Sequence, residues 1–189
     1  MRKKVKVILG SVRTGRAGKV VADWFMREAE KYDGNLDIEF IDLADVDLPF
    51  MDEPIPPGMS GGNYVNDHTK EWSRVINEAD GFVFVTPEYN HGYSPALKNA
   101  IDYLKDEWNE KPVAFVGYGL GGATHSINQL KQVVEFLGMR VLDERIGISE
   151  VWAALDESGG VKAEKLTGDV GTLLTVLEDA LTEASVAGS

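Results

Sequence analysis

The sequence predicts an α/β fold in which a five-stranded parallel sheet carries helices on both faces. Short runs rich in Val, Ile and Leu alternate with segments whose apolar residues recur at helical spacing, five times along 189 residues. Right-handed crossovers that wind in both directions from the first strand give five strands the order 2-1-3-4-5. Ligands of such sheets bind beyond the carboxyl ends of the strands, where the winding direction reverses.

Each element has its own signal along the chain. We expect strands over five segments, namely residues 3–9, 36–43, 81–86, 112–116 and 140–148. Helical periodicity covers residues 16–32, 67–79, 94–108, 124–137 and 163–184. Gly34 is expected to stop the first helix, and Ser94, followed by a proline, is expected to cap the third. Residues 45–64 hold too many prolines and glycines for a regular element, so they form a long loop that is either functional or mobile.

Length and composition indicate one soluble domain. A chain of 189 residues with 43% hydrophobic residues can bury a single core, so we expect residues 1–189 to form one unit whose tail frays after Ala184. No run approaches the roughly 18 apolar residues of a membrane span, and no signal-peptide cleavage site follows the basic N-terminus. The absence of cysteine excludes disulfides and fits a cytoplasmic protein, whose redox chemistry would require a cofactor.

The net charge of the chain limits the classes of ligand that it is expected to bind. The net charge of −12 disfavours nucleic acid and anionic membranes, because both attract surplus Lys and Arg. The first 22 residues nevertheless contain seven basic residues and no acid. An acidic protein with one basic region suggests a small anionic ligand.

The turn after the first predicted strand, GSVRTGRAGK (residues 10–19), is suited to a phosphate. It is not a nucleotide P-loop, because Arg16 and Ala17 replace the lysine and hydroxyl residue, nor a dinucleotide fingerprint, because Arg13 replaces a glycine. Amide hydrogens at a helix start and arginine side chains both favour phosphate. Alternatively, Arg13 and Arg16 are solvated surface charges beside an ordinary turn.

Two further turns follow the third and fourth predicted strands. TPEYNHGYSPALKNAIDYL (residues 86–104) places Tyr89 and nearby amides where they could lie against a flat heteroaromatic ring. GYGLGGAT (residues 117–124) has four glycines in its first six residues, which let the backbone approach a ligand closely or merely serve a tight turn. All three turns are expected at the same edge of the sheet.

Other polar residues carry no catalytic pattern. The histidines at 68, 91 and 125 lack the i, i+4 spacing of a helical metal pair, so no metal site is predicted. Ser11 lacks the Gly-x-Ser-x-Gly pattern of a hydrolase nucleophile.

The motifs GSVRTGRAG (residues 10–18) and PEYNHGYSPALKNAIDYL (residues 87–104) resemble those of the NADPH-dependent FMN reductases, which include quinone, azo-dye and chromate reductases. The resemblance extends over roughly residues 3–180 and implies a flavodoxin-like three-layer sandwich. It implies that FMN is the cofactor and that NADPH or NADH is the co-substrate.

Carried over by position, the resemblance assigns FMN contacts to three groups of residues. Ser11, Arg13, Arg16, Ala17 and Gly18 would hold the phosphate; Pro87, Glu88, Tyr89 and Asn90 would border the isoalloxazine; and its other edge would meet Gly117, Tyr118 and Gly119. No catalytic side chain is expected, because the flavin itself accepts hydride at N5 and passes the electrons on.

The resemblance also implies partners. The electron acceptor would be a small molecule such as a quinone, an azo compound, chromate or free flavin. The chain would form a homodimer or homotetramer, with residues 94–108 and 45–64 as candidates for the subunit boundary. The alternative function is a flavodoxin-like electron carrier or binding module that holds FMN without accepting electrons from pyridine nucleotide. A third reading is a domain that binds another phosphate and no flavin.

Overall fold

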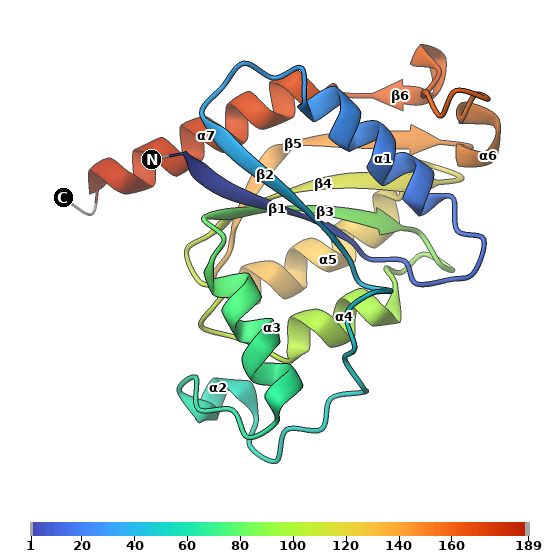
Figure 1. Ribbon diagram of the computed structural model, residues 1–189. Coiled ribbons are helices and arrows are strands. Elements are labelled where there is room, and N and C mark those ends of the chain that lie inside the picture. The colour runs from blue at the N-terminus through green and yellow to red at the C-terminus, as the bar shows by residue number, and fades with distance from the viewer. Residues whose placement is uncertain (1, 188–189) are drawn as a thin grey trace.

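The computed structural model describes residues 2–187 as a parallel-dominated sheet covered by helices on both faces (Figure 1). The strands are β1 Lys3–Leu9, β2 Leu36–Asp42, β3 Gly81–Pro87, β4 Pro112–Gly119, β5 Arg140–Ser149 and β6 Leu166–Thr167. The helices are α1 Gly18–Ala29, α2 Pro57–Ser60, α3 Asp67–Asn77, α4 Pro95–Asp102, α5 Thr124–Phe136, α6 Val151–Ala154 and α7 Val170–Ala187, with a 3₁₀ turn at Ala163–Lys165. No helix within the described range has the length and hydropathy needed to cross a bilayer.

The strand order is β2-β1-β3-β4-β5-β6, so the predicted order 2-1-3-4-5 is confirmed. The sheet gains a sixth strand that the sequence did not indicate, because β6 pairs antiparallel with the end of β5 through Gly147–Thr167 and Ile148–Leu166. The first five strands run parallel and end at one edge. Their carboxyl ends therefore lie together, as expected.

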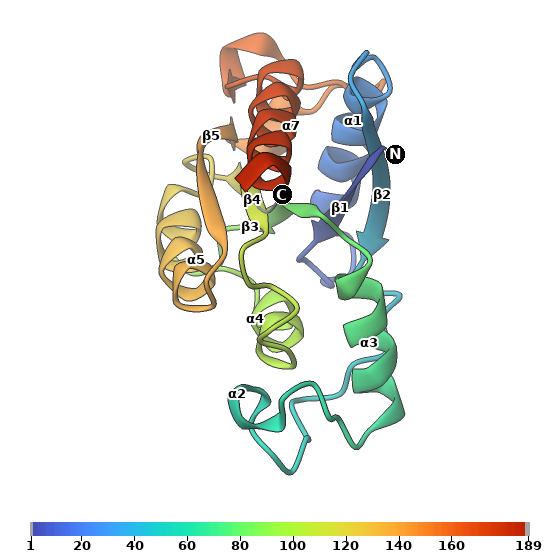
Figure 2. The same cartoon turned by 90° about the vertical axis from the view of Figure 1, so that its left-hand side faces the viewer.

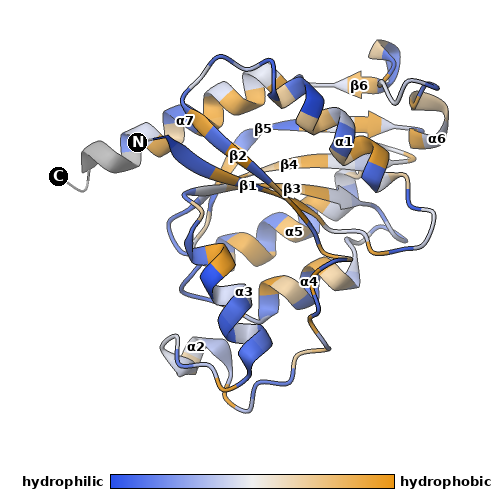
Figure 3. Ribbon diagram, in the orientation of Figure 1, coloured by the Kyte–Doolittle hydropathy of each residue, from blue (hydrophilic) through white to orange (hydrophobic). Residues whose placement is uncertain are grey.

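Helices α1 and α7 lie on one face of the sheet and α3, α4 and α5 on the other (Figure 2), and an apolar core fills the space on each face. One face of β1 buries Val5 and Val7 against α1 and α7, and Ile8 packs toward α3, α4 and α5 on the other. Hydrophilic residues dominate the outer surface of α3, whereas β4 is largely apolar (Figure 3). The alternation along β1 thus fixes which side of the sheet each helix covers.

The helix after β3 is shorter than predicted. α4 ends at Asp102, whereas the sequence pattern extended to Trp108. The indole of Trp108 donates to the carbonyl of Ile101 at 3.1 Å, and that of Trp72 donates to the carbonyl of Ala100 at 2.8 Å. These carbonyls belong to the last turn of α4, where few backbone amides remain to donate to them. The two buried indoles satisfy them instead, and the helix ends there.

The last helix begins later than predicted, at Val170 instead of residue 163. Gly168 has φ 77°, and Asp169 accepts the amide of Thr172 at 2.9 Å and its hydroxyl at 2.6 Å, as a helix N-cap does. α1 is shorter too: it ends at Ala29, and Glu30 is its C-cap in place of a glycine stop at Gly34. The structure describes α7 as far as Ala187; a frayed tail after Ala184 stays a prediction, and for residues 188 and 189 it falls outside the described residues.

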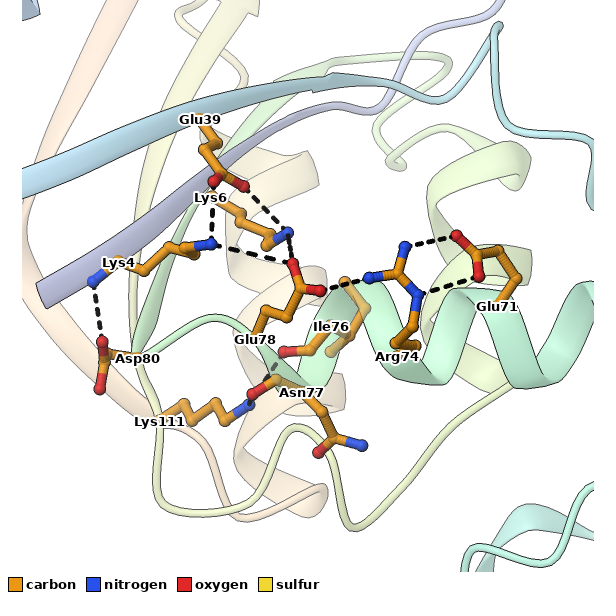
Figure 4. Close-up of polar contacts among 10 residues, drawn as sticks. All are labelled: Lys4, Lys6, Glu39, Glu71, Arg74, Ile76, Asn77, Glu78, Asp80 and Lys111. Carbon is orange, nitrogen blue, oxygen red and sulfur yellow. Dashed lines mark hydrogen bonds and ion pairs between the residues drawn. The ribbon is translucent and has the colours of Figure 1, made fainter.

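An ion-pair network lies beside the start of β1 (Figure 4). The buried Lys6 ammonium lies 3.0 Å from a carboxylate oxygen of Glu39 and 3.2 Å from one of Glu78. Hydrogen bonds from Lys4 and Lys6 lower the pKa of Glu39. The basic residues at the N-terminus are therefore partly used within the fold and do not all serve a ligand.

Candidate functional site

Hydrogen bonds connect the three predicted turns at the carboxyl edge of the sheet. The hydroxyl of Ser11 lies 2.5 Å from the phenol oxygen of Tyr89 and joins the first turn to the second. The amide of Glu88 donates to the carbonyl of Tyr118 at 3.2 Å and joins the second turn to the third. The fold therefore brings all twelve predicted contact residues to one edge.

The first turn presents unused amide donors. Of the hydrogen bonds formed by the described residues, none uses the backbone N–H of residues 11–15 or of Ala17. Arg16 is the exception, since its amide reaches the carbonyl of Arg13 at 3.2 Å. α1 follows with no capping side chain and no acidic residue in its first turn. Such a helix start has the positive electrostatic potential and the free donors that bind anions.

The two arginines of this turn differ. Arg16 pairs with Asp42, the last residue of β2, whose other oxygen accepts the amide of Ala44 at 3.0 Å. Arg13 is exposed, and its guanidinium makes only a weak bond to the carbonyl of Thr14 at 3.4 Å. Arg13 is therefore the arginine that is free to reach an anion, whereas Arg16 is held in place by β2.

Gly18 and Tyr118 meet beneath the turn. A Cβ at position 18 would lie 2.1 Å from the phenol oxygen of Tyr118, so only glycine fits there. That phenol oxygen is buried and has no hydrogen-bond partner within the described part of the chain, and Nε of Arg16 is in the same condition. Burial raises the pKa of Tyr118, so its hydroxyl stays a neutral donor. Buried donors without partners beside a turn of free amides fit the phosphate group of FMN.

The second turn is a tight hairpin. Tyr89 and Gly92 exchange both backbone hydrogen bonds, at 2.7 and 3.0 Å, and the two residues between them have positive φ, 51° for Asn90 and 68° for His91. Two positive φ values are typical of a type I′ turn, which Asn tolerates better than most residues. Pro87 ends β3 and accepts the hydroxyl of Ser126 at 2.8 Å. This geometry leaves Asn90 at the tip.

Glu88 was expected to border the isoalloxazine ring, but its side chain also has a structural role. Its Oε2 accepts the amides of His125 at 3.0 Å and Ser126 at 3.3 Å, so the carboxylate caps the start of α5. The position of this side chain is thus fixed by the third turn.

Some of the glycines in the third turn have packing roles. A Cβ on Gly117 would lie 2.5 Å from the carbonyl of Gly122 and 2.7 Å from Ile127, because the turn folds back over β4. Gly119 has φ 157°, and a Cβ added there would lie 3.5 Å from Cβ of Glu88. Tight packing of the turn therefore explains some of these glycines without a ligand.

Sequence reasoning missed two residues that shape the site. The buried hydroxyl of Ser94 donates to the carbonyl of Gly10 and accepts the amide of Leu97 at 3.2 Å, so the cap of α4 also anchors the first turn. The other residue is Asp42, which pairs with Arg16; its place at the end of a strand beside the first one could have indicated this role. Beside the turn, a cavity of about 500 Å³ lies between Val12, residues 43–50 and α4.

The sequence also matches a known family. The profile of the NADPH-dependent FMN reductases matches residues 3–153. The chain belongs to this family. An NAD(P)H-dependent FMN reductase of Schizosaccharomyces pombe is 49% identical over 138 residues, which are 73% of this chain and 68% of the relative. Another, from Nectria sp, is 34% identical over 185 residues, covering 93% and 92%.

Solved structures agree in fold. The flavoenzyme NAD(P)H:(acceptor) oxidoreductase FerB of Paracoccus denitrificans superposes with a TM-score of 0.67 at 24% identity, covering 94% of this chain and 93% of that one. The flavodoxin-like fold, the enzyme class and the FMN and NAD(P)H dependence expected from the sequence are confirmed. Membership in a family of reductases favours the enzyme over the FMN carrier without nucleotide turnover.

Proposed function

We propose that residues 1–189 form one cytoplasmic FMN-binding domain that oxidises NADPH or NADH and delivers the electrons to quinones or similar small acceptors. The observation that carries this proposal is the first turn, where three features converge: free amides, the start of α1 without a capping side chain, and the guanidinium of Arg13, which has no acidic partner among the described residues. These groups suit a phosphomonoester, which FMN has and most other flat redox cofactors lack.

The bound flavin would supply the hydride and electron chemistry. The chain would hold and orient it. Arg13 and the free amides of residues 11–15 and Ala17 would bind the phosphate, and Arg16 would support the turn through Asp42. Tyr89, held by Ser11, and the tip at Asn90 would border the ring, with Gly119 on the opposite side. No side chain is required as a general base, so none is assigned as catalytic.

Relatives whose names specify an acceptor support quinones as substrates. They include an NAD(P)H:quinone oxidoreductase of Solanum tuberosum, 30% identical over 145 residues, and a 2-hydroxy-1,4-benzoquinone reductase of Burkholderia sp, 26% identical over 175 residues. The cavity beside Val12 has room for a small ring and is lined mainly by apolar side chains. It lies next to the first turn and is the place where we expect such an acceptor.

We also propose that the enzyme is a homodimer or homotetramer with α4 and residues 45–64 at the subunit boundary. Large apolar side chains of this loop are exposed, with Phe50 85% and Met59 79% accessible. Val12 and Ile55 nearby are about half exposed. Exposed apolar residues clustered in one region mark interaction surfaces. Sedimentation analysis of wild type and of a Phe50→Ser, Met59→Ser variant tests this boundary.

The activity is tested by steady-state kinetics. FMN-free protein, reconstituted with FMN, should oxidise NADPH or NADH in the presence of 1,4-benzoquinone, and the rate should depend on bound FMN. Rapid mixing with NADPH alone should bleach the flavin absorbance within the turnover time. Absence of turnover with either nucleotide, with the flavin bound and unbleached, would contradict the proposal and favour an electron carrier.

A further inference from the structure

A cluster of three side chains lies at the rim of the site, and its two histidines have no role in the function described above. It consists of Glu88, His91 and His125, which come from the hairpin after β3 and the start of α5. One donor atom of each lies within 4.8 Å of the other two. The two imidazole rings are stacked in parallel, with centroids 4.0 Å apart and an interplanar angle of 14°.

Contacts outside the cluster fix the carboxylate of Glu88 and the backbone of the two histidines. Glu88 uses only Oε2 to cap α5, which leaves Oε1 for another partner. The carbonyl of His91 accepts the side-chain amide of Gln129 at 3.0 Å, which ties the hairpin to α5. His125 lies in the first turn of α5, so its backbone is fixed by the helix. The donors are thus brought together by the fold and not by flexible chain ends.

Ring packing alone does not account for this arrangement. Both imidazoles are exposed, so their contact buries little apolar surface. The hairpin holds His91 at φ 68°, a left-handed conformation that Asn, Asp and His adopt more often than other residues with a Cβ, so the backbone sets the position from which this imidazole extends.

We propose that Glu88, His91 and His125 form a binding site for a divalent transition metal ion, with Zn²⁺ as the reference ion. Two imidazole nitrogens and one carboxylate oxygen make a donor set that proteins use for zinc, with a fourth position open to water or another ligand. Imidazole donors select Zn²⁺, Ni²⁺ or Cu²⁺ over Mg²⁺ and Ca²⁺, which prefer oxygen. The net charge of −12 further favours a cation.

Binding of a zinc ion would require the three donor atoms to move only slightly closer together. Donor atoms in a tetrahedral zinc site are about 3.3 Å apart, given zinc–ligand distances of about 2.0–2.1 Å. The donor atoms lie within 4.8 Å of one another, so zinc binding would require them to approach by at most about 1.5 Å, which rotation of the two exposed imidazoles would supply. Oε1 of Glu88 does not have to break the bonds of Oε2.

Isothermal titration of the chelator-treated, FMN-loaded chain with ZnCl₂ tests the site. We expect saturable binding of one zinc per chain, and no competition from a large excess of Mg²⁺. Replacement of Zn²⁺ by Co²⁺ should give visible absorption bands of a four-coordinate ion. No saturable binding, or one zinc per two chains, would overturn the proposal.

Variants locate the ion. His91→Asn keeps a residue that accepts positive φ, and His125→Gln keeps a helix-compatible side chain, so both should fold. Each should weaken zinc binding by at least about tenfold, since even the outer partners of zinc ligands contribute 10- to 100-fold. His68→Gln is the matched control, because this histidine pairs with Asp52 away from the cluster, and it should leave the affinity unchanged. Unchanged affinity in the His91→Asn, His125→Gln double variant, or an equal loss in His68→Gln, would overturn the assignment.

Discussion

Arg16 pairs with Asp42 across the space between the first turn and the end of β2, whereas Arg13, three residues earlier, has no acidic partner among the described residues. In the sequence the two arginines look equivalent. In the fold one of them braces the turn and the other remains free for a ligand. The two residues therefore predict different consequences when each is removed.

Replacing Arg13 with Ala should weaken FMN binding by about 1–3 kcal/mol, because a charged hydrogen bond to the phosphate is lost. The folding stability of the FMN-free chain should not change, since the side chain is exposed and makes only one weak bond. Quenching of FMN fluorescence during titration measures the affinity. Equal affinity in wild type and variant would remove Arg13 from the phosphate site.

Replacing Arg16 with Ala should mainly reduce stability. The variant leaves the carboxylate of Asp42, only 7% exposed, without its cationic partner. Removing one member of a buried ion pair costs about 3–5 kcal/mol. Urea unfolding of the FMN-free protein measures the effect, with Arg13→Ala as the matched control. A stability loss no larger than that of the control would contradict the bracing role.

The Tyr118→Phe variant should have a lower affinity for FMN without a loss of folding stability. The hydroxyl is buried and has no hydrogen-bond partner among the described residues, so removing it should leave the FMN-free stability unchanged or raise it. If the hydroxyl donates to the bound cofactor, FMN affinity should fall by about 0.5–1.5 kcal/mol. Parallel thermal unfolding and FMN titration provide both values. Stability that falls while affinity holds would show that the hydroxyl serves the fold and not the ligand.

Lys111 predicts a pH dependence of stability. Burial lowers the pKa of Lys111 to about 8 from its ordinary 10.5, although its ammonium donates to the carbonyl of Ile76 at 2.9 Å at the end of α3 (Figure 4). Between these two values the unfolded chain holds a proton that the folded chain has released, so this lysine makes stability rise with pH across that interval.

The measurement is urea unfolding of wild type and Lys111→Met from pH 7 to pH 10. The stability of wild type relative to the variant should increase above pH 8. Lys31→Met, at an exposed lysine paired with Glu28, provides the background of all other titrating groups. A relative stability that stays flat or falls would contradict the effect of burial on Lys111.

The sequence predicted the sheet well because its signals are local. Short segments such as residues 3–9 and 81–86, which are rich in Val, Ile or Phe and followed by turn residues, favour strands, and their alternation with helices favours the order. The predicted end of α4 was wrong for a nonlocal reason, because Trp72 reaches it from another helix and no local pattern reveals this. The predicted start of α7 was wrong for a local reason, because the apolar periodicity extends past the cap at Asp169.

The sequence predicted where the site lies but not which of its side chains contact one another. The positions of the three turns follow from the strand order, so residues 10–18 and 87–90 were predicted to lie together. The pairing of Arg16 with Asp42 depends on side chains 26 residues apart, and the meeting of His91 with His125 on side chains 34 apart. Such contacts arise from the packing of parallel strands, and the spacing rules for helical metal pairs do not apply to them.

The binding site itself is tested most directly by a crystal structure of the chain soaked with FMN. We expect density for the phosphate against the amides of residues 11–15 and Ala17 and the guanidinium of Arg13, with the ring between the hairpin at residues 87–92 and the turn at residues 117–122. Density for FMN elsewhere on the protein, with this edge of the sheet empty, would contradict the assignment.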